Sequence, residues 1–329
     1  MALKHSVLKI LEENREISIS GEKLASELSV SRSAIWKAIN TLKSEGYEII
    51  AIRNKGYKLA LNTDILSSEG ITPFLKDDYK KNNILVMKSV GSTNKEAKKL
   101  CIDNTSHGTV LVANEQDSGK GRLGRKFFSP KDTGIYMSII LCPNIDISSA
   151  VLITTATSVA VCRAIRKVSN LNPEIKWVND IFLNNKKICG ILTEAITDFE
   201  SGMVENIIIG IGLNFKTKKE QFPDELQDIA GSIFESDETE ITRNNLVGEI
   251  INEVLNIYEN LNKKDFLNEY KELSLVLGKD IKYSQRNKWH NAKAIDIDSN
   301  GSLIVKCEDG TIKTLNSGEI SVRRITDET

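Results

Sequence analysis

The sequence predicts an α+β protein of several domains: an N-terminal winged helix-turn-helix, a central domain with a mixed sheet, and a small C-terminal β-barrel. Three observations support this fold class. Helically spaced apolar residues lead into two short strands near the N-terminus, strands cluster as hairpins between helices in the middle, and apolar residues alternate near the C-terminus. A length of 329 residues suffices for two or three domains. We expect a head at 1–62, a linker at 63–83, a central domain at 84–274 and a tail at 275–329.

The head carries the local signals of three helices and a hairpin. Apolar residues at helical spacing across Val7–Leu11 predict the first helix. Ser20 and Ser31 are typical N-caps of a second and a third helix. Two short strands, Tyr47–Ile52 and Gly56–Leu61, then form the wing.

The outer face of the third predicted helix and the tip of the wing are polar and basic. Residues 1–60 carry ten Lys/Arg and seven Asp/Glu, although the whole chain has a net charge of −1. In a winged helix-turn-helix, the third helix enters the major groove and the wing contacts the backbone. A three-helix domain for protein contacts is the alternative, and Trp36 could complete the core instead of touching a base. The expected DNA contacts are Arg32, Ser33, Lys37, Asn40, Arg53 and Lys55.

The central domain alternates strand and helix patterns. A polar connector with a short helix near Ile71–Leu75 precedes it, and Asn184-Asn185 is typical of a hairpin turn. Hairpins with helices at both ends favour a mostly antiparallel or mixed sheet. The predicted strands are Ile84–Val90, Thr109–Asn114, Gly134–Cys142, Ile175–Leu183, Lys186–Glu194 and Asn206–Asn214; the helices, besides one that begins at Ser92-Thr93-Asn94, are Ser149–Val168, Thr242–Leu261 and Asp265–Leu273.

The tail has a period of two, interrupted by turns at Asp298–Gly301 and Glu308–Gly310. Short strands with tight turns are typical of a small barrel of SH3 type. The predicted strands are Asp280–Gln285, Asn291–Asp296, Ser302–Cys307, Thr311–Leu315 and Ile320–Arg324.

Residues 115–130 combine backbone freedom with positive charge. Glycine lets backbone N–H groups approach a ligand closely, and arginine presents a rigid donor fork that suits phosphate and carboxylate. We therefore expect an anion-binding loop that orders when a nucleotide or carboxylate arrives; a solvated basic hairpin tip is the alternative. The pattern is not the Walker motif. The residues concerned are Gly119, Lys120, Gly121, Arg122, Gly124 and Arg125.

Several polar groups elsewhere in the central domain are hard to explain as surface residues. Asp180 interrupts an apolar strand, Lys187 follows a turn, and Asn214 ends an apolar strand. Each could be a turn residue or a solvated charge, but with Arg122 they supply two cations, a carboxylate and an amide for a pocket. Ser92–Asn94 places hydroxyl and amide groups beside free helical N–H donors, although an N-cap alone would explain it.

Cysteine, histidine and hydropathy patterns exclude several classes of protein. The five cysteines are scattered and never spaced as C-x-x-C, which fits reduced cytoplasmic thiols and neither a disulfide framework nor a zinc site. A reactive Cys189 is conceivable, but a small buried residue is the better interpretation. The three histidines are far apart, so no metal ligands are expected. We see no signal peptide, and the longest uncharged run, Ile147–Cys162, is shorter than the ~20 residues of a membrane span.

Eight motifs follow one another along the chain: Ser31–Ile39, Asn54–Tyr57, Ser92–Asn94, Gln116–Arg125, Lys176–Asp180, Lys187–Leu192, Gly210–Asn214 and Ser317–Arg323. Each is weak alone, but their order and spacing together are specific. With them, the whole length of the chain resembles the family of bifunctional biotin protein ligases and biotin operon repressors.

The resemblance implies a two-step reaction with biotin, ATP and Mg²⁺. Biotin and ATP give biotinyl-5′-AMP and pyrophosphate, and a lysine of a biotin carboxyl-carrier domain then takes the biotinyl group. The resemblance further implies a central domain like that of class II aminoacyl-tRNA synthetases. It also implies a cytoplasmic homodimer that binds operator DNA with biotinyl-5′-AMP as corepressor.

The same resemblance assigns roles by motif. Arg122, with Gly119, would hold the biotin carboxylate and then the adenylate phosphate, Lys187 would bridge the two groups, and Asp180 would orient or deprotonate the incoming lysine. The remaining binding positions are Ser92, Thr93 and Gln116 around the biotin head group, Asn214 at the adenylate, and Asn94, Gly121, Gly124 and Gly190 within the same motifs.

The chain departs from the family pattern at a few positions. Leu123 stands where Arg is common, Phe127 where Trp is common, and Val178 where Pro is usual. Two other functions fit parts of the pattern: a ligase whose head no longer represses, and a biotin-responsive regulator without ligase activity. The basic third helix disfavours the former, and the retained Arg122 and Lys187 disfavour the latter.

Overall fold

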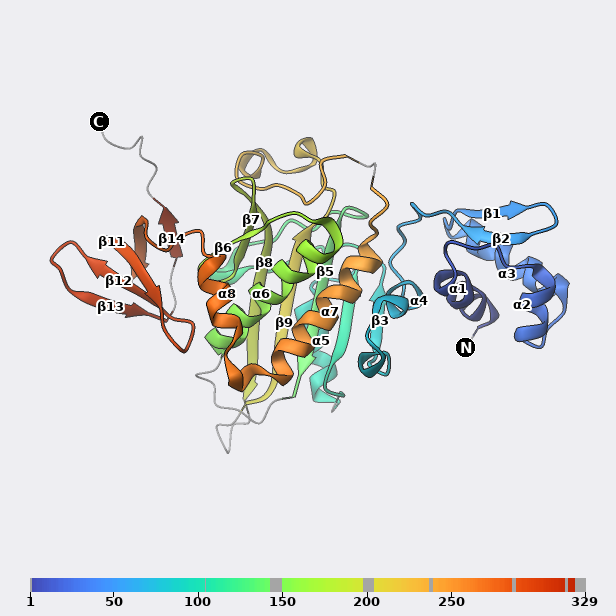
Figure 1. Cartoon of the computed structure of the whole chain (residues 1–329), viewed down its shortest axis with the longest axis horizontal. Helices are drawn as coiled ribbons and strands as arrows, with labels where there is room; N and C mark the ends of the chain where they lie inside the picture. The colour runs from blue at the N-terminus through green and yellow to red at the C-terminus, as the bar shows by residue number, and fades with distance from the viewer. Residues whose placement is uncertain are drawn as a thin grey trace. The chain divides into compact units, whose positions relative to one another are not determined.

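A computed structural model describes residues 2–103, 105–142, 150–197, 204–236, 239–285, 288–316 and 319–322 (Figure 1). Contacts divide the chain into two compact units. The first comprises Met1–Lys81 with Ser236–Glu249, and the second comprises Asn82–Glu235 with Ile250–Thr329. A stretch from far along the sequence therefore belongs with the head, which sequence periodicity did not indicate.

The first unit contains the predicted helix-turn-helix and wing. The predicted N-caps of the second and third helices are confirmed. Ser20 Oγ accepts a hydrogen bond from Lys23 N at 3.0 Å, and Ser31 Oγ accepts one from Ala34 N at 3.2 Å. The two wing strands pair antiparallel, with Ile49 opposite Leu59. The elements are α1 (Leu3–Glu13), α2 (Gly21–Glu27), α3 (Arg32–Ser44), β1 (Ile49–Ile52) and β2 (Gly56–Leu59).

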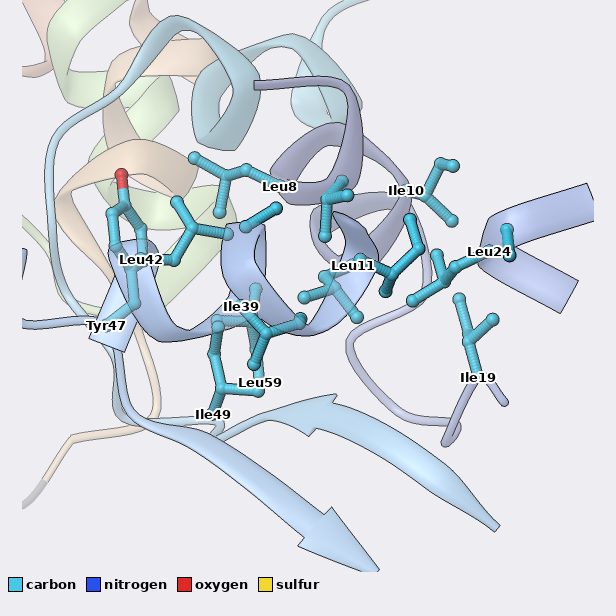
Figure 2. Close-up of a cluster of buried hydrophobic side chains, with 14 residues drawn as sticks. Leu8, Ile10, Leu11, Ile19, Leu24, Ile39, Leu42, Tyr47, Ile49 and Leu59 are labelled. Carbon is cyan, nitrogen blue, oxygen red and sulfur yellow. The ribbon is translucent and has the colours of Figure 1, made fainter. Parts of the chain in front are cut away.

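One apolar cluster holds these elements together (Figure 2). Leu11 of α1, Ile39 of α3 and Leu59 of β2 are all buried in it. Burying a side chain of this size stabilises the fold by roughly 1.5–3 kcal/mol. Trp36 does not belong to the cluster, because 58% of its surface is exposed. The alternative in which Trp36 completes the core is therefore wrong.

The connector after the head is more structured than expected. It contains α4 (Ser68–Ile71) and two 3₁₀ turns, η1 (Thr72–Phe74) and η2 (Asp77–Tyr79), so the short helix begins earlier than predicted. Asp64 anchors this stretch to Arg243: Arg243 Nε lies 3.0 Å from Asp64 Oδ2, and Arg243 N donates to Asp64 Oδ1 at 2.8 Å. Arg243 is only 2% exposed, so this contact is a buried ion pair.

The second unit is built on a mixed seven-stranded sheet, which confirms the prediction. The strand order is β3-β4-β5-β9-β8-β7-β6; β3 and β4 are parallel, and all other neighbours are antiparallel. The strands are β3 (Ile84–Met87), β4 (Thr109–Ala113), β5 (Gly134–Leu141), β6 (Glu174–Lys176), β7 (Asp180–Leu183), β8 (Lys186–Thr197) and β9 (Val204–Asn214).

The predicted single strand over 175–183 is wrong. It is two strands, β6 and β7, that pair antiparallel with Lys176 opposite Asp180. Residues 177–179 form the reversal between them, and the Trp177–Val178 peptide bond is cis. Asp180 therefore stands at the start of a strand and beside a turn, not in the middle of an extended segment.

Helices cover one face of the sheet (Figure 1). Helix α5 (Thr93–Ile102) packs on β5 and β9, and α6 (Ala150–Ser169) packs on β8. The predicted first residue of α6, Ser149, lies outside the described residues. Two further helices, α7 (Arg243–Glu259) and α8 (Phe266–Glu272), follow the sheet in the chain.

The tail forms a five-stranded antiparallel sheet in the order β13-β12-β11-β10-β14. Trp177 Nε1 donates to Gly301 O at 2.9 Å and so ties the tail to the β6–β7 turn. Residues 317–318 and 323–324 of the predicted motif and last strand lie outside the described residues. The strands are β10 (Asp280–Gln285), β11 (Lys288–Ile297), β12 (Leu303–Cys307), β13 (Ile312–Leu315) and β14 (Glu319–Val322).

Candidate active site

A cavity of about 820 Å³ opens in the second unit and is large enough for a nucleotide with a small acid. The start of α5, the glycine-rich loop, the β6–β7 turn and the ends of β8 and β9 all contribute to it. Gly119 and Gly124 do not line it. The predicted residues that do line it are Ser92, Thr93, Asn94, Gln116, Lys120, Gly121, Arg122, Arg125, Asp180, Lys187, Gly190 and Asn214.

The start of α5 presents a buried polar group to the cavity. Ser92 is the N-cap residue by position, yet its side chain makes no capping hydrogen bond. An N-cap serine normally satisfies one of the free helical N–H groups. The Ser92 hydroxyl, although buried, is thus available to a ligand.

Gln116 is held in one orientation beside it. Its Oε1 accepts hydrogen bonds from Thr93 N at 2.9 Å and Thr93 Oγ1 at 3.2 Å. Its Nε2 donates to Ser129 Oγ at 2.9 Å. These contacts fix the amide before any ligand is present, so this end of the cavity has a defined pattern of donors and acceptors.

Asn94 is held at the cavity by hydrogen bonds from both ends of its side-chain amide. Its Oδ1 accepts from Ser138 Oγ at 2.6 Å, and its Nδ2 donates to Glu194 Oε2 at 2.8 Å. Lys98 Nζ pairs with Glu194 Oε1 at 2.6 Å. Burial alone would raise the pKa of Glu194, but the hydrogen bonds from Lys98 and Asn94 outweigh it and lower the pKa. Glu194 therefore stays ionised and holds the Asn94 amide in place.

Two glycines of β9 make room for side chains that shape the cavity. A Cβ at Gly210 would lie 2.3 Å from Asn94 Oδ1, and a Cβ at Gly212 would lie 2.6 Å from the Phe127 ring. Phe127 therefore lies directly against the backbone of β9. The spacing of glycines in Gly210-Ile211-Gly212 is explained by these close approaches.

The glycine-rich loop folds back on itself as a hairpin. Gly121 N donates to Arg125 O at 2.8 Å, and Phe127 N donates to Gly119 O at 2.9 Å. Among the three loop glycines only Gly124 has a positive φ, of 74°. Gly119 is needed for a different reason, because a Cβ there would lie 2.5 Å from Phe127 O.

Arg122 of this loop contacts the β6–β7 turn. Its Nη1 donates to Asn179 Oδ1 at 3.0 Å, and Asn179 Nδ2 donates to Ile191 O at 2.9 Å. Asn179 was not among the predicted site residues, although it lies within the Lys176–Asp180 motif. The contact holds the guanidinium group over the cavity.

Lys187 and Asp180 form an ion pair across β7 and β8, with Nζ 2.6 Å from Oδ1. Despite this short distance, Asp180 Oδ1 accepts no aligned hydrogen bond from the described residues. The carboxylate thus retains acceptor capacity for a further donor. Two adjacent residues, Asn179 and Asp180, position the two cations Arg122 and Lys187.

Asn214 closes the other end of the cavity. Its Nδ2 donates to Gly231 O at 2.9 Å. Its Oδ1 is buried and accepts no hydrogen bond from the described residues. A buried acceptor without a donor is costly, by roughly 1–3 kcal/mol, so this oxygen points to a ligand that donates.

The apolar part of the cavity was largely missed by sequence reasoning. Phe127 was singled out only as a departure from the family pattern, and the other apolar and tail residues come from separate segments that no shared motif connects. The aromatic pair Phe127-Phe128 after the glycine-rich loop is the sequence feature that could have indicated an apolar lining. The residues are Phe128, Phe222, Leu226, Ile229, Ala230, Leu275, Lys279 and Ile320.

Other predictions about chemistry concern cysteine, metal and membrane. Cys189 is fully buried, and burial raises its pKa, so it is not a reactive thiol. All five cysteines are free. Among the described residues, no three His, Cys, Asp or Glu side chains cluster to hold a metal. No helix in the described part of the chain combines the length and apolarity of a membrane span.

The predicted DNA contacts form a second candidate site, on the head. Arg32, Ser33 and Lys37 are exposed on α3, Asn40 is half-buried, and Arg53 and Lys55 are exposed at the wing tip. No ion pair involves these cations within the described ranges. The face is therefore positively charged and open to solvent.

Comparison with known families matches three segments of the chain. Residues 86–214 match the Biotin/lipoate A/B protein ligase family, residues 4–58 match an HTH domain, and residues 276–323 match the Biotin protein ligase C terminal domain. The first segment contains the polar residues predicted to line the cavity, the second contains the basic face, and the third contains the tail sheet.

Whole-chain relatives agree with this order. The Bifunctional ligase/repressor BirA of Bacillus spizizenii is 33% identical over 97% of this chain and 98% of its own length. The protein of the same name from Escherichia coli is 27% identical over 92% of each chain. A solved structure of biotin protein ligase from Aquifex aeolicus, in complex with biotin and ATP, is 28% identical, with a TM-score of 0.61, covering 74% of this chain and 99% of that one.

Proposed function

Because the chain belongs to the family of bifunctional biotin ligases and repressors, we propose that it joins biotin to a carrier-protein lysine and represses transcription. It makes biotinyl-5′-AMP from biotin and ATP, then transfers the biotinyl group. The observation that carries the ligase function is the placement of Arg122 and Lys187 at one cavity, each oriented by a neighbour on the β6–β7 turn.

In the first step, a carboxylate oxygen of biotin attacks the α-phosphorus of ATP, and the bond to the bridging oxygen of pyrophosphate breaks. Negative charge accumulates on the α-phosphoryl oxygens and on the leaving group. Arg122 and Lys187 offset this charge, and Gly121 allows the loop backbone to approach it, while Gly119 leaves room for Phe127 O behind the loop. Removing such a donor typically costs ~10²–10³ in rate.

The head group of biotin occupies the polar end of the cavity. Ser92 offers an uncommitted hydroxyl, and the fixed Gln116–Thr93 pair supplies the complementary pattern for a small ureido group. Asn94 acts behind them through its bonds to Ser138 and Glu194. Asn214 faces the adenylate end, where its free Oδ1 would accept a ligand N–H.

In the second step, the amine of the acceptor lysine attacks the acyl carbon, and AMP leaves with the electrons of the broken C–O bond. The attacking nitrogen must lose a proton. The Asp180 carboxylate is the acceptor we assign to it, because it lines the cavity beside Lys187. Gly124, with its positive φ, lets the loop turn beside Arg122 so that it shields the mixed anhydride from water.

Mg²⁺ enters this scheme as part of the substrate MgATP. The described residues offer no cluster of carboxylates that would form a protein cage for it. Mg²⁺ commonly binds substrate phosphates and water with few protein ligands. No step above depends on the protein holding it.

As a repressor, the protein loaded with biotinyl-5′-AMP forms a homodimer on an operator with two half-sites, and the α3 face contacts the major groove. We place this activity in the cytoplasm. We also propose that the central sheet is of the class II aminoacyl-tRNA synthetase type and the tail an SH3-like barrel. The functional division of the chain is 1–62, 63–83, 84–274 and 275–329.

One assay separates the proposed ligase from a regulator that only binds biotin. The full chain is incubated with radiolabelled biotin, MgATP and a biotin carboxyl-carrier domain, and the protein-bound label is counted. We expect label on one carrier lysine and none when that lysine is replaced by Arg. Absence of label with the intact carrier, despite biotin binding, would leave only the regulator.

A further inference from the structure

Trp36 has no role in the scheme above, although it is the most exposed of the chain's tryptophans. Fully 58% of its surface is accessible, against 52% for Trp289 and 3% for Trp177. Its indole forms no hydrogen bond or ring contact with any described residue. An exposed indole is a large apolar surface, so a partner that covered it would gain free energy from the burial.

Its place on α3 defines what lies around it. Ile35, Ala38 and Ile39 face the core of the head, and Trp36 lies about 100° further round the helix. Ser33 and Asn40, three residues before and four after it, lie on the same stripe. The indole is therefore flanked by side chains that form hydrogen bonds.

The charged residues around Trp36 indicate which kind of partner fits this surface. Arg32 precedes Trp36 by one turn, Lys37 follows it, and Lys55 lies at the wing tip. None of these cations pairs with an acidic group of the described residues. A polyanion complements this surface, whereas an apolar protein partner would leave the cations buried without partners.

Resting on the proposed DNA-binding function, we propose that Trp36 reads the C5-methyl group of thymine in the major groove. This methyl is the apolar group that the major groove presents, and it distinguishes thymine from cytosine. Ser33 and Asn40 are then placed to bond the polar edges of neighbouring bases. Trp36 thus sets sequence preference, and the basic residues set affinity for the phosphates.

The test uses the full-length chain with biotin and ATP to select duplexes from a random library. In the selected duplex, each thymine is replaced in turn by deoxyuridine, which lacks only the methyl. We expect one thymine per half-site at which replacement weakens binding about fourfold, the effect of exposing one buried methyl group. In Trp36→Ala, thymine and uracil at that position should bind equally.

Matched variants keep the result interpretable. Trp289→Ala removes the other exposed tryptophan and should leave the thymine preference intact. Lys37→Ala should weaken thymine and uracil duplexes alike. Because Trp36 is exposed, Trp36→Ala should keep the thermal unfolding midpoint and the rate of biotin transfer of the parent protein.

Two negative results have different meanings. Selection that enriches no sequence would overturn the proposed DNA-binding function and this inference with it. Enrichment of a duplex whose thymine-over-uracil preference survives in Trp36→Ala would overturn the role of Trp36 alone. A change of sedimentation in Trp36→Ala without a change of base preference would do the same, since it would assign the indole to a protein contact.

Discussion

In the cavity, Arg122 and Lys187 are each held by a neighbouring side chain before any ligand arrives, at 3.0 Å from Asn179 and 2.6 Å from Asp180. On the head, Arg32 and Lys37 extend into solvent, with no ion pair to the described residues. The two regions carry the same kind of charge but prepare it differently. When a small anion binds in the cavity, Arg122 and Lys187 exchange contacts with protein side chains for contacts with the anion. When a long polyanion binds on the head, it displaces the solvent ions and water around Arg32 and Lys37.

This difference explains what each region can discriminate. Oriented groups in a half-buried cavity favour one charge distribution at one position, which suits a transition state. Mobile cations on a surface bind phosphates of any sequence, and their contribution falls with salt. Selectivity on the head must therefore come from side chains that touch bases.

The largest expected effect is in the cavity. Lys187→Ala should lower biotin-dependent ATP–pyrophosphate exchange by roughly 10²–10³-fold, because a fixed cation at the reacting phosphate is lost. The neighbouring Lys186→Ala is the matched control, since the only hydrogen bond from Lys186 Nζ to a described residue is to Gln227 O, at 3.5 Å. Normal exchange in Lys187→Ala would remove this residue from the first step.

Asp180→Asn should separate the two steps. We expect transfer from preformed biotinyl-5′-AMP to the carrier to fall about 10²-fold, the usual contribution of a general base, with a smaller loss in pyrophosphate exchange. Asp228→Asn is the control, because Asp228 also lines the cavity but, among the described residues, forms an ion pair only with Lys219, at 3.4 Å. Equal losses in both steps would contradict a role confined to transfer.

Gly212→Ala tests the shape of the cavity and leaves its charge unchanged. The added methyl would lie 2.6 Å from the Phe127 ring, so Phe127 must shift. Overpacking of this kind costs roughly 1–3 kcal/mol, and we expect the Kd for biotin, measured by calorimetry, to rise on the order of tenfold. Gly91→Ala, where no atom lies within 4 Å of the new Cβ, should leave the Kd unchanged.

The smallest effect is expected on the head. Lys37→Ala should weaken binding to a selected duplex a few-fold and reduce the slope of log K against log salt by about 0.9, the value for one phosphate contact. Biotin transfer should be unchanged. If titrations at several salt concentrations gave parallel lines for the variant and the parent, Lys37 would not contact a phosphate.

Local signals in the sequence were sufficient to predict much of the fold. Ser20 and Ser31 cap their helices because a cap depends only on a residue and its next three neighbours. Residues 175–183 were misjudged because a tight reversal keeps the strand pattern on both sides, and Asn179-Asp180 was interpreted as an interruption within one strand. The mixed sheet followed from the grouping of hairpins.

The site divides in the same way. Asp180 and Lys187 were found because charges stood out within apolar strands. Their pairing and the Arg122–Asn179 contact depend on how distant segments meet, which no local pattern encodes. The apolar part of the cavity around Phe222 and Ile229 was not predicted, because apolar residues in loops carry no distinctive sequence signal.

The buried contact between Asp64 and Arg243 also bears on how the chain folds during synthesis. The wing and its three helices have all been synthesised once residue 59 has left the ribosome, and the buried side chains of their shared cluster lie between Val7 and Leu59. The base of the same unit must wait until Arg243 emerges, 179 residues after Asp64. At ~5–20 residues per second, that interval lasts on the order of ten seconds or more. Throughout it, the Asp64 carboxylate cannot form its ion pair with Arg243.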